Sequence, residues 1–82
     1  MATTPYELIG GVYLSNRAYM NITGCFVDWC CLNKIDDEYI TRDDISKFIK
    51  DTRNLFEEKE DVVRAALRKY YRYFDKEYLL DL

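Results

Sequence analysis

The stretch that decides the fold is Thr41–Leu80, TRDDISKFIKDTRNLFEEKEDVVRAALRKYYRYFDKEYLL. Apolar side chains recur along it at steps of three and four residues, which places them on one face of an α-helix. They are Ile45, Phe48, Ile49, Leu55, Phe56, Val62, Val63, Ala66, Leu67, Tyr70 and Phe74. The stripe predicts a long C-terminal helix. Because a small globule buries more apolar surface by folding back on itself, we expect a bend within residues 51–61, where Asn54 could cap a second helix.

Length and composition predict one small helical domain. The 82 residues include 49% hydrophobic and 16% aromatic side chains, with eight tyrosines. A chain of this length buries a thin core, and small helical domains often gain stability by self-association. We therefore predict an all-α fold, a single-domain bundle of three to four helices over residues 1–82, and a homodimer is plausible.

The first segment carries mixed signals. Thr4–Glu7 has the residue types of a helix start, with a capping Thr, a Pro at the first helical position and a Glu of a capping box. Gly10 and Gly11 then weaken a helix by roughly 1 kcal/mol each relative to alanine. We predict a helix here, with a partly extended segment as the alternative. Its apolar face would hold Leu8, Ile9, Val12 and Tyr13.

A second helix is predicted from Ser15 or Asn16 to about Asn33. Thr23–Gly24 could bend it. Within this helix, Cys25–Leu32 contains Asp28 as its one charged residue, so we expect it to be the most buried part of the chain.

The connection between the second and third helices resembles part of a calcium-binding loop. Tyr39–Ile45 matches the second half of an EF-hand loop, with an apolar residue, a capping Thr and an acid in sequence. The first half departs from that pattern, because Ile35 stands where a ligand is needed and Glu38 where the turn requires Gly. We interpret Asn33–Asp44 as an acidic interhelical loop leading into a helix capped by Thr41, with calcium binding as the alternative.

The thiols indicate neither a disulfide framework nor a metal site. Cys25, Cys30 and Cys31 are odd in number and clustered, and the chain contains no His. A structural zinc site needs four ligands, and nucleophilic catalysis through a His base cannot be built. We therefore expect buried, reduced thiols in a non-enzymatic protein without metal or cofactor.

Localisation signals are also lacking in the sequence. The opening residues have no basic region typical of a signal peptide. The most apolar window, Ala18–Leu32, is interrupted by polar residues and is shorter than the ~20 residues that a membrane span needs. The expected location is the cytoplasm.

Charge is distributed unevenly along the chain. The net charge is −3, yet residues 36–61 hold ten acids and five bases, whereas residues 62–82 hold five bases and three acids. Four of these bases follow at four-residue steps and form a basic ridge on the predicted helix, with Glu60 placed to neutralise one of them. Tyr71 and Tyr73 lie near its borders. Arginine beside tyrosine is typical of contact surfaces, so the predicted partner-binding residues are Arg64, Arg68, Tyr71, Arg72 and Lys76.

Three interpretations of the basic ridge stay open. It could be a solvated face that answers the acids of residues 36–61, a contact for an acidic protein partner, or a surface for nucleic acid. We predict a regulatory or inhibitory protein that binds a protein partner stoichiometrically. The alternative is a nucleic-acid-binding regulator that uses the same ridge.

Two stretches resemble a known group of proteins. Met1–Tyr6 and the aromatic, basic run Arg68–Tyr78 are similar to the small cytosolic early proteins of T-even bacteriophages, a group that includes antiholins of lysis inhibition. The resemblance implies that the partner is the cytosolic part of a holin, and that binding in the host cytoplasm delays pore formation.

Overall fold

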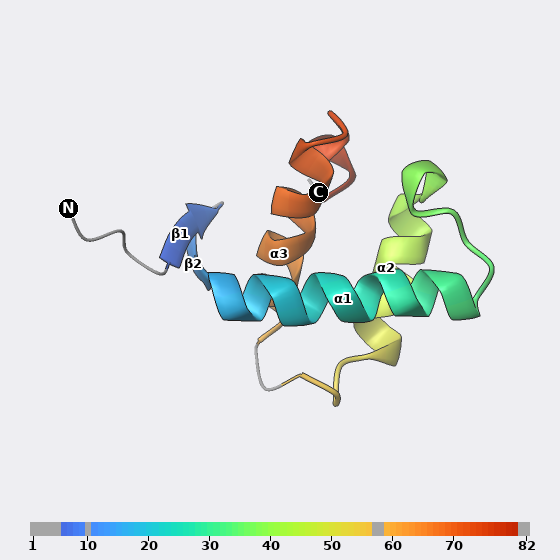
Figure 1. The fold of residues 1–82 in the computed structure, drawn as a ribbon, viewed down its shortest axis with the longest axis horizontal. Helices are drawn as coiled ribbons and strands as arrows, with labels where there is room; N and C mark the ends of the chain where they lie inside the picture. Colours follow the sequence, from blue (N-terminus) through green and yellow to red (C-terminus); the bar gives the residue numbers. More distant parts are fainter. Residues whose placement is uncertain (1–5, 10, 57–58, 81–82) are drawn as a thin grey trace.

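The computed structural model describes residues 6–9, 11–56 and 59–80 (Figure 1). This part of the chain is mostly α-helical, as predicted, but it also contains a two-stranded antiparallel sheet. The expectation of a purely all-α fold is therefore wrong at the N-terminal end. The elements in chain order are β1 (Tyr6–Ile9), β2 (Val12–Ser15), α1 (Asn16–Leu32), the 3₁₀ turn η1 (Asp37–Tyr39), α2 (Arg42–Asp51), α3 (Glu60–Arg72) and the 3₁₀ turn η2 (Glu77–Leu80).

A β-hairpin takes the place of the predicted first helix. Ile9 pairs with Val12, so the chain reverses its direction between these two residues. Gly11 has a φ of 83°, which residues with a Cβ rarely adopt. Two-residue glycine loops suit hairpins because their backbone twist matches that of the strands. The predicted helix start at Thr4 and Pro5 lies outside the described residues.

The hairpin shows the two-residue alternation of a half-buried sheet. Ile9 and Leu14 are each 1% exposed and join the core. Leu8 and Tyr13, which pair across the strands, are 58% and 72% exposed. The hairpin thus has one face on the core and one in solvent.

Helix α1 begins at the predicted place. The Ser15 hydroxyl accepts a hydrogen bond from the Ala18 N–H at 3.0 Å, and the helix ends at Leu32 with Asn33 as its C-cap. Figure 1 shows α1 as one continuous helix, and its bounds include Thr23 and Gly24. The Thr23 hydroxyl donates to the Tyr19 carbonyl at 2.7 Å, so it is satisfied within the helix without bending it.

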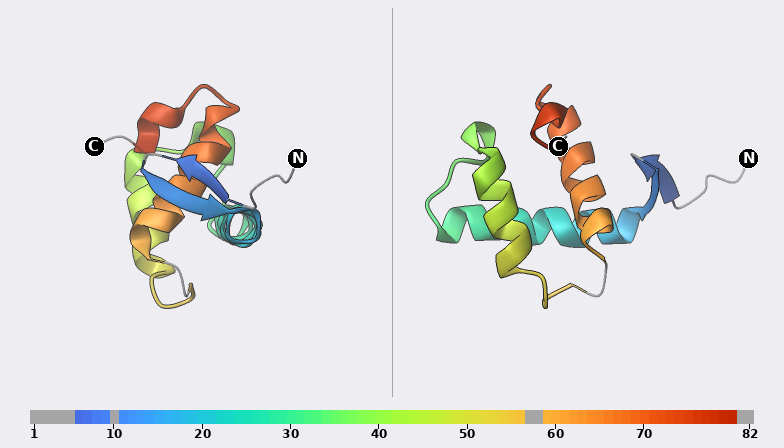
Figure 2. Two further views of the ribbon diagram at one scale, coloured as in Figure 1. Left: turned by 90° about the vertical axis from the view of Figure 1, so that its left-hand side faces the viewer. Right: turned by 180° about the vertical axis from the view of Figure 1, so that it is seen from behind.

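The second half of α1 is less buried than predicted. Phe26, Trp29 and Cys30 face the core, but Cys31 is exposed and Leu32 is 83% exposed. Only one side of α1 is covered, because α2 and α3 both cross it on the same side (Figure 2). A continuous apolar run therefore cannot be buried along its whole circumference.

Helix α2 has the predicted N-terminal cap. The Asp44 N–H donates to the Thr41 hydroxyl at 3.2 Å, and the Thr41 N–H donates to the Asp44 carboxylate at 3.1 Å. This capping box satisfies two backbone donors that the helix itself leaves unpaired.

The long C-terminal helix is not formed, whereas the predicted bend is. Helix α2 ends at Asp51, and α3 begins at Glu60, not near Asn54. The Thr52 hydroxyl donates to the Phe48 carbonyl at 2.6 Å and closes the end of α2. Helix α3 ends at Arg72, and a positive φ of 56° at Asp75 turns the chain into η2.

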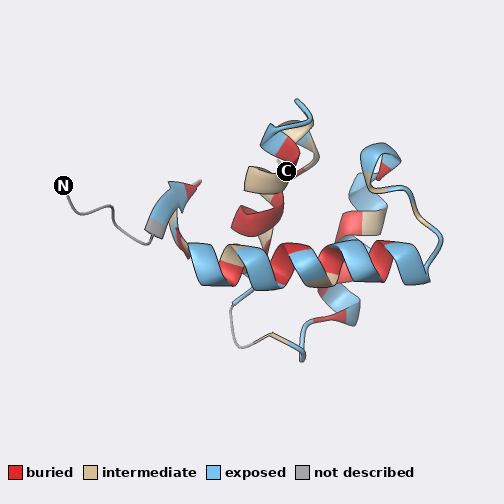
Figure 3. Ribbon diagram, in the orientation of Figure 1, coloured by how far each residue is buried: buried red, intermediate tan, exposed pale blue. Residues whose placement is uncertain are grey.

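The core lies between α1 and the pair of helices that crosses it (Figure 3). Phe26 is at its centre, with its ring centroid 4.9 Å from Phe48, 5.9 Å from Tyr71 and 6.1 Å from Tyr70. These contacts are edge-to-face, the geometry that aromatic pairs favour. The apolar stripe of residues 41–80, which the structure divides between α2 and α3, thus supplies the side of the core that faces α1.

Candidate functional site

The predicted basic ridge is shorter than its sequence spacing indicates. Arg64, Arg68 and Arg72 follow one another along α3, as predicted. Lys76 lies beyond the end of α3, after the turn at Asp75, and so is not on the ridge. From there its ammonium group donates a hydrogen bond to the carbonyl of Glu38.

Tyr71, one of the predicted contact residues, belongs to the core. Its side chain is completely buried, and its hydroxyl donates to the main-chain carbonyl of Asp37 at 2.7 Å. Burial, and secondly the nearby Cys30 and Asp37, raise the pKa of Tyr71 above its usual value. A partner cannot reach this ring while the domain is folded, so the expectation of a contact at Tyr71 is wrong. Tyr73, by contrast, is 76% exposed.

Carboxylates of the chain itself lie along the ridge. Arg64 pairs with Glu60 at 3.5 Å, the neutralisation predicted from their four-residue spacing. Arg68 and Arg72 both lie near Glu77, at 3.9 Å and 3.6 Å. Among the described residues, the ridge thus pairs with Glu60, which is one of the acids of residues 36–61, and with Glu77. Ion pairs as exposed as these contribute ~0–1 kcal/mol each, so they lower the local charge without fixing the arginines firmly.

A groove lies between the hairpin and α3. Its volume is about 160 Å³, and its lining residues are Ile9, Val12, Asp61, Arg64, Ala65 and Arg68. The hairpin contributes the apolar pair that flanks its turn, and the first three turns of α3 contribute the remainder. We call this the hairpin groove.

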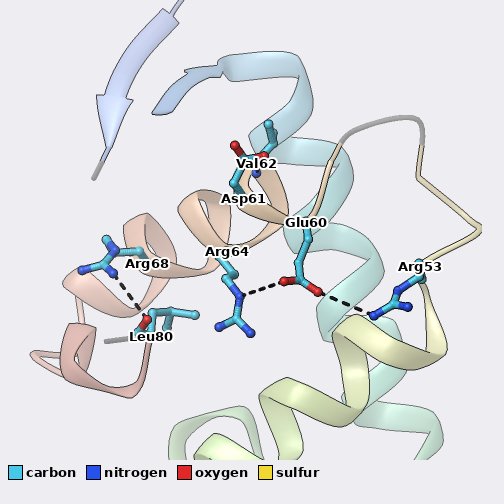
Figure 4. Close-up of polar contacts among 7 residues, drawn as sticks. All are labelled: Arg53, Glu60, Asp61, Val62, Arg64, Arg68 and Leu80. Atoms are coloured by element: carbon cyan, nitrogen blue, oxygen red, sulfur yellow. Dashed lines mark hydrogen bonds and ion pairs between the residues drawn. The ribbon is translucent and has the colours of Figure 1, made fainter. Parts of the chain in front are cut away.

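The hairpin groove combines an apolar floor with charged edges. Arg64 and Arg68 retain 30% and 25% side-chain exposure. Figure 4 shows Arg64 next to Glu60, whose carboxylate also faces Arg53, and shows Arg68 donating to the Leu80 carbonyl at 3.4 Å. Sites for small molecules span about 300–1,000 Å³, so the hairpin groove suits one or two protruding side chains and not a cofactor.

The loop that resembles half of a calcium site uses its carboxylates internally. Asp36 accepts from the Glu38 N–H at 3.0 Å, and Asp44 belongs to the cap of α2. Asp37 accepts a hydrogen bond from the hydroxyl of Tyr70. These contacts support the interpretation as an interhelical loop. No group of three or more acidic, Cys or His side chains among the described residues is placed to hold a metal.

The three thiols differ in environment. Cys30 is buried, Cys25 is partly buried and Cys31 is exposed, so the expectation of buried thiols is wrong for Cys31. Burial, and then the nearby Asp37 and Asp44, raise the pKa of Cys30 to about 11. A thiol with a raised pKa is a poor nucleophile at neutral pH.

Comparison of the chain with protein-family models, with curated proteins and with solved structures finds no match in any of the three. None of the helices in residues 6–9, 11–56 and 59–80 combines the length and the apolar character required to span a bilayer.

Sequence reasoning found the arginines of the hairpin groove but missed its other wall. Ile9 and Val12 were predicted to lie in a helix, and the groove brings them next to residues of α3 that are about fifty positions away in the sequence. The signal that could have found them is the Gly10–Gly11 pair between two short apolar segments, which is typical of a hairpin.

Proposed function

We propose that the chain is a non-enzymatic regulatory protein that acts by stoichiometric binding to a protein partner, and that the hairpin groove receives that partner. The observation that carries this proposal is the position of Arg64 and Arg68 beside an apolar floor formed by Ile9, Val12 and Ala65. An apolar side chain next to a carboxylate on the partner would complement both features.

The long internal ion pair of Arg64 supports the same proposal. The N–O distance from Arg64 to Glu60 is 3.5 Å, longer than that of a good charge-assisted hydrogen bond. A partner carboxylate that approaches Arg64 more closely can displace this contact at low cost. The charge complementarity would mainly set partner choice and the rate of association.

The resemblance to T-even phage early proteins adds a specific partner to this proposal. If it extends to function, the chain is an antiholin that binds the cytosolic part of a holin in the host cytoplasm and delays lysis. Phage origin, partner and location all depend on that resemblance.

The alternative, a nucleic-acid-binding regulator, is less well supported. Binding to the phosphate backbone of nucleic acids gains most of its affinity from Lys and Arg that neutralise phosphates, and nearby carboxylates oppose it. Asp61, Glu60 and Glu77 stand among the arginines, and Lys76 is turned away to Glu38. The remaining positive charge is therefore small.

A titration of the chain with the cytosolic part of a T-even holin tests the proposal by calorimetry. We expect saturation at a fixed stoichiometry and at least a tenfold loss of affinity for the double variant Arg64→Gln/Arg68→Gln. A matched control is Lys47→Gln/Lys50→Gln, which removes two exposed cations from α2. Circular dichroism spectra of both variants must match that of the parent.

Three results would contradict the proposal. One is the absence of binding. Another is an equal loss of affinity in the control variant, which would indicate non-specific charge attraction. The last is tighter binding to duplex DNA, with an affinity that falls log-linearly with salt concentration, which would favour the alternative.

A further inference from the structure

The face of α1 that points away from the core carries an apolar stripe. Met20, Gly24, Val27 and Cys31 follow at steps of three and four residues, so they share one side of the helix. All four are exposed, Met20 to 62% and Val27 to 43%. Figure 1 shows α1 in front of the other helices, and Figure 3 shows exposed positions along its near side. No element in the described part of the chain covers this face.

Two charges border the stripe, and the one in the first turn of the helix, Arg17, is placed against the preference of the helix dipole. Arg17 and Asp28 are the charged residues of α1, and both are exposed. The first turn contains no acid and the last turn no base, although the helix dipole favours acids at the N-terminus and bases at the C-terminus. Within residues 6–9, 11–56 and 59–80, neither side chain forms an ion pair or a hydrogen bond. The helix dipole therefore disfavours Arg17, and Asp28, which lies before the last turn, gains no ion pair within the described residues.

We propose that a second copy of this chain covers the stripe, with its own α1 packed antiparallel. An antiparallel copy brings the end of one α1 beside the beginning of the other, so Arg17 of each copy lies opposite Asp28 of the other. The two charges of each helix thus form two complementary pairs in the dimer. A parallel copy would instead place Arg17 against Arg17.

The same register also gives complementary shapes. When residue 17 faces residue 28, Met20 comes opposite the region of Gly24 in the second copy. A Cβ built on Gly24 would meet nothing within 4 Å, so there is room for the long Met side chain. Met adapts well to such gaps because its side chain is unbranched and flexible.

The expected dimer is weak. A helix of 17 residues is about 25 Å long, and one such face covers less than the ~800 Å² per partner of a standard interface. Self-association is therefore expected at high micromolar concentration and above. This interface is separate from the hairpin groove and does not depend on the proposed function.

Charge reversal tests the proposal by sedimentation equilibrium of the full chain over a range of concentrations. Arg17→Asp or Asp28→Arg alone places like charges opposite each other, and we expect at least a tenfold weaker dimer. The double variant Arg17→Asp/Asp28→Arg restores opposite charges and should dimerise like the parent. Each substitution follows the helix-dipole preference, so helicity measured by circular dichroism should be kept.

Disulfide formation at Cys31 distinguishes an antiparallel dimer from a parallel one. In the antiparallel dimer the two Cys31 residues are about 25 Å apart along the helix axes, given a rise of ~1.5 Å per residue, so oxidation should not join them efficiently. A parallel dimer would place them together. A parent chain that stays monomeric at millimolar concentration, a double variant that fails to recover dimerisation, or rapid Cys31–Cys31 disulfide formation would each overturn the proposal.

Discussion

Removal of the Tyr71 hydroxyl should destabilise the domain measurably while leaving its core packing intact. In Tyr71→Phe the ring keeps its edge-to-face contact with Phe26, whose centroid is 5.9 Å away. The variant loses the 2.7 Å hydrogen bond to the carbonyl of Asp37. A net hydrogen bond contributes ~0.5–1.5 kcal/mol, and an acceptor that stays unsatisfied costs ~1–3 kcal/mol. Asp37 is only partly buried, so water can replace the donor in part, and we expect a loss of about 1–1.5 kcal/mol.

Urea and thermal unfolding followed by circular dichroism measure this loss. For a domain of this size, each kcal/mol lowers the Tm by about 4–8 °C. The matched control is Tyr73→Phe, because Tyr73 is 76% exposed and its substitution should change the free energy of unfolding by less than ~0.5 kcal/mol. Equal stability of Tyr71→Phe and the parent, or an equal loss in the control, would refute a stabilising role for the hydrogen bond from Tyr71 to Asp37. In addition, partner affinity should be the same for the Tyr71→Phe variant and the parent.

Three further predictions concern local features of the fold. Thr41→Ala removes the cap of α2 and should cost about 1 kcal/mol in urea unfolding, whereas Thr41→Ser should retain most of it. Gly11→Ala should cost about 1–2 kcal/mol, because the φ of 83° is unfavourable for a residue with a Cβ even though the surrounding space is open. Burial first, and then Asp37 and Asp44, raise the pKa of Cys30 to about 11 from a usual value of 9.0. Stability from the neutral thiol is complete below pH 9 and is lost as pH rises toward 11, by up to about 2–3 kcal/mol. Cys30→Ala should therefore show a flatter decline in stability between pH 9 and 11 than the parent.

Each of these predictions has a clear contrary result. Equal losses for the Ala and Ser variants at Thr41 would show that the cap hydroxyl is unimportant. An unchanged Tm in Gly11→Ala would mean that the turn is not left-handed at this position. Parallel pH profiles for Cys30→Ala and the parent would place the titrating groups elsewhere in the protein.

Local signals in the sequence predicted much of the helical part of the fold. The caps at Ser15 and Thr41 were found because a hydroxyl placed before a helix acts on a backbone N–H only three residues away. The bend between α2 and α3 followed from the need of a short chain to bury its apolar stripe. The caps depend on residues close together in the sequence, and the bend depends on the length of the chain. Both can be read directly from the sequence.

The errors involve competing patterns or distant contacts. Leu8, Ile9, Val12 and Tyr13 satisfy helical spacing, so the turn formed at Gly11 was given too little weight. Tyr71 falls beside the predicted ridge on a helical wheel, but its partner, the Asp37 carbonyl, is 34 residues away. Lys76 leaves the ridge because Asp75 adopts a positive φ, which no residue type other than Gly strongly signals. Only the α3 side of the hairpin groove could be predicted. Its other side is the hairpin, which was predicted as a helix.

The attachments of η1 have a consequence for how the domain opens. This three-residue turn accepts hydrogen bonds from the side chains of Tyr70, Tyr71 and Lys76. All three donors belong to the C-terminal quarter of the chain. Release of that quarter would deprive the loop of these three donors at once. Amide hydrogen exchange in residues 37–39 should therefore follow the opening of the end of α3 and not the fraying of α2, so that two segments remote in sequence behave as a single cooperative unit.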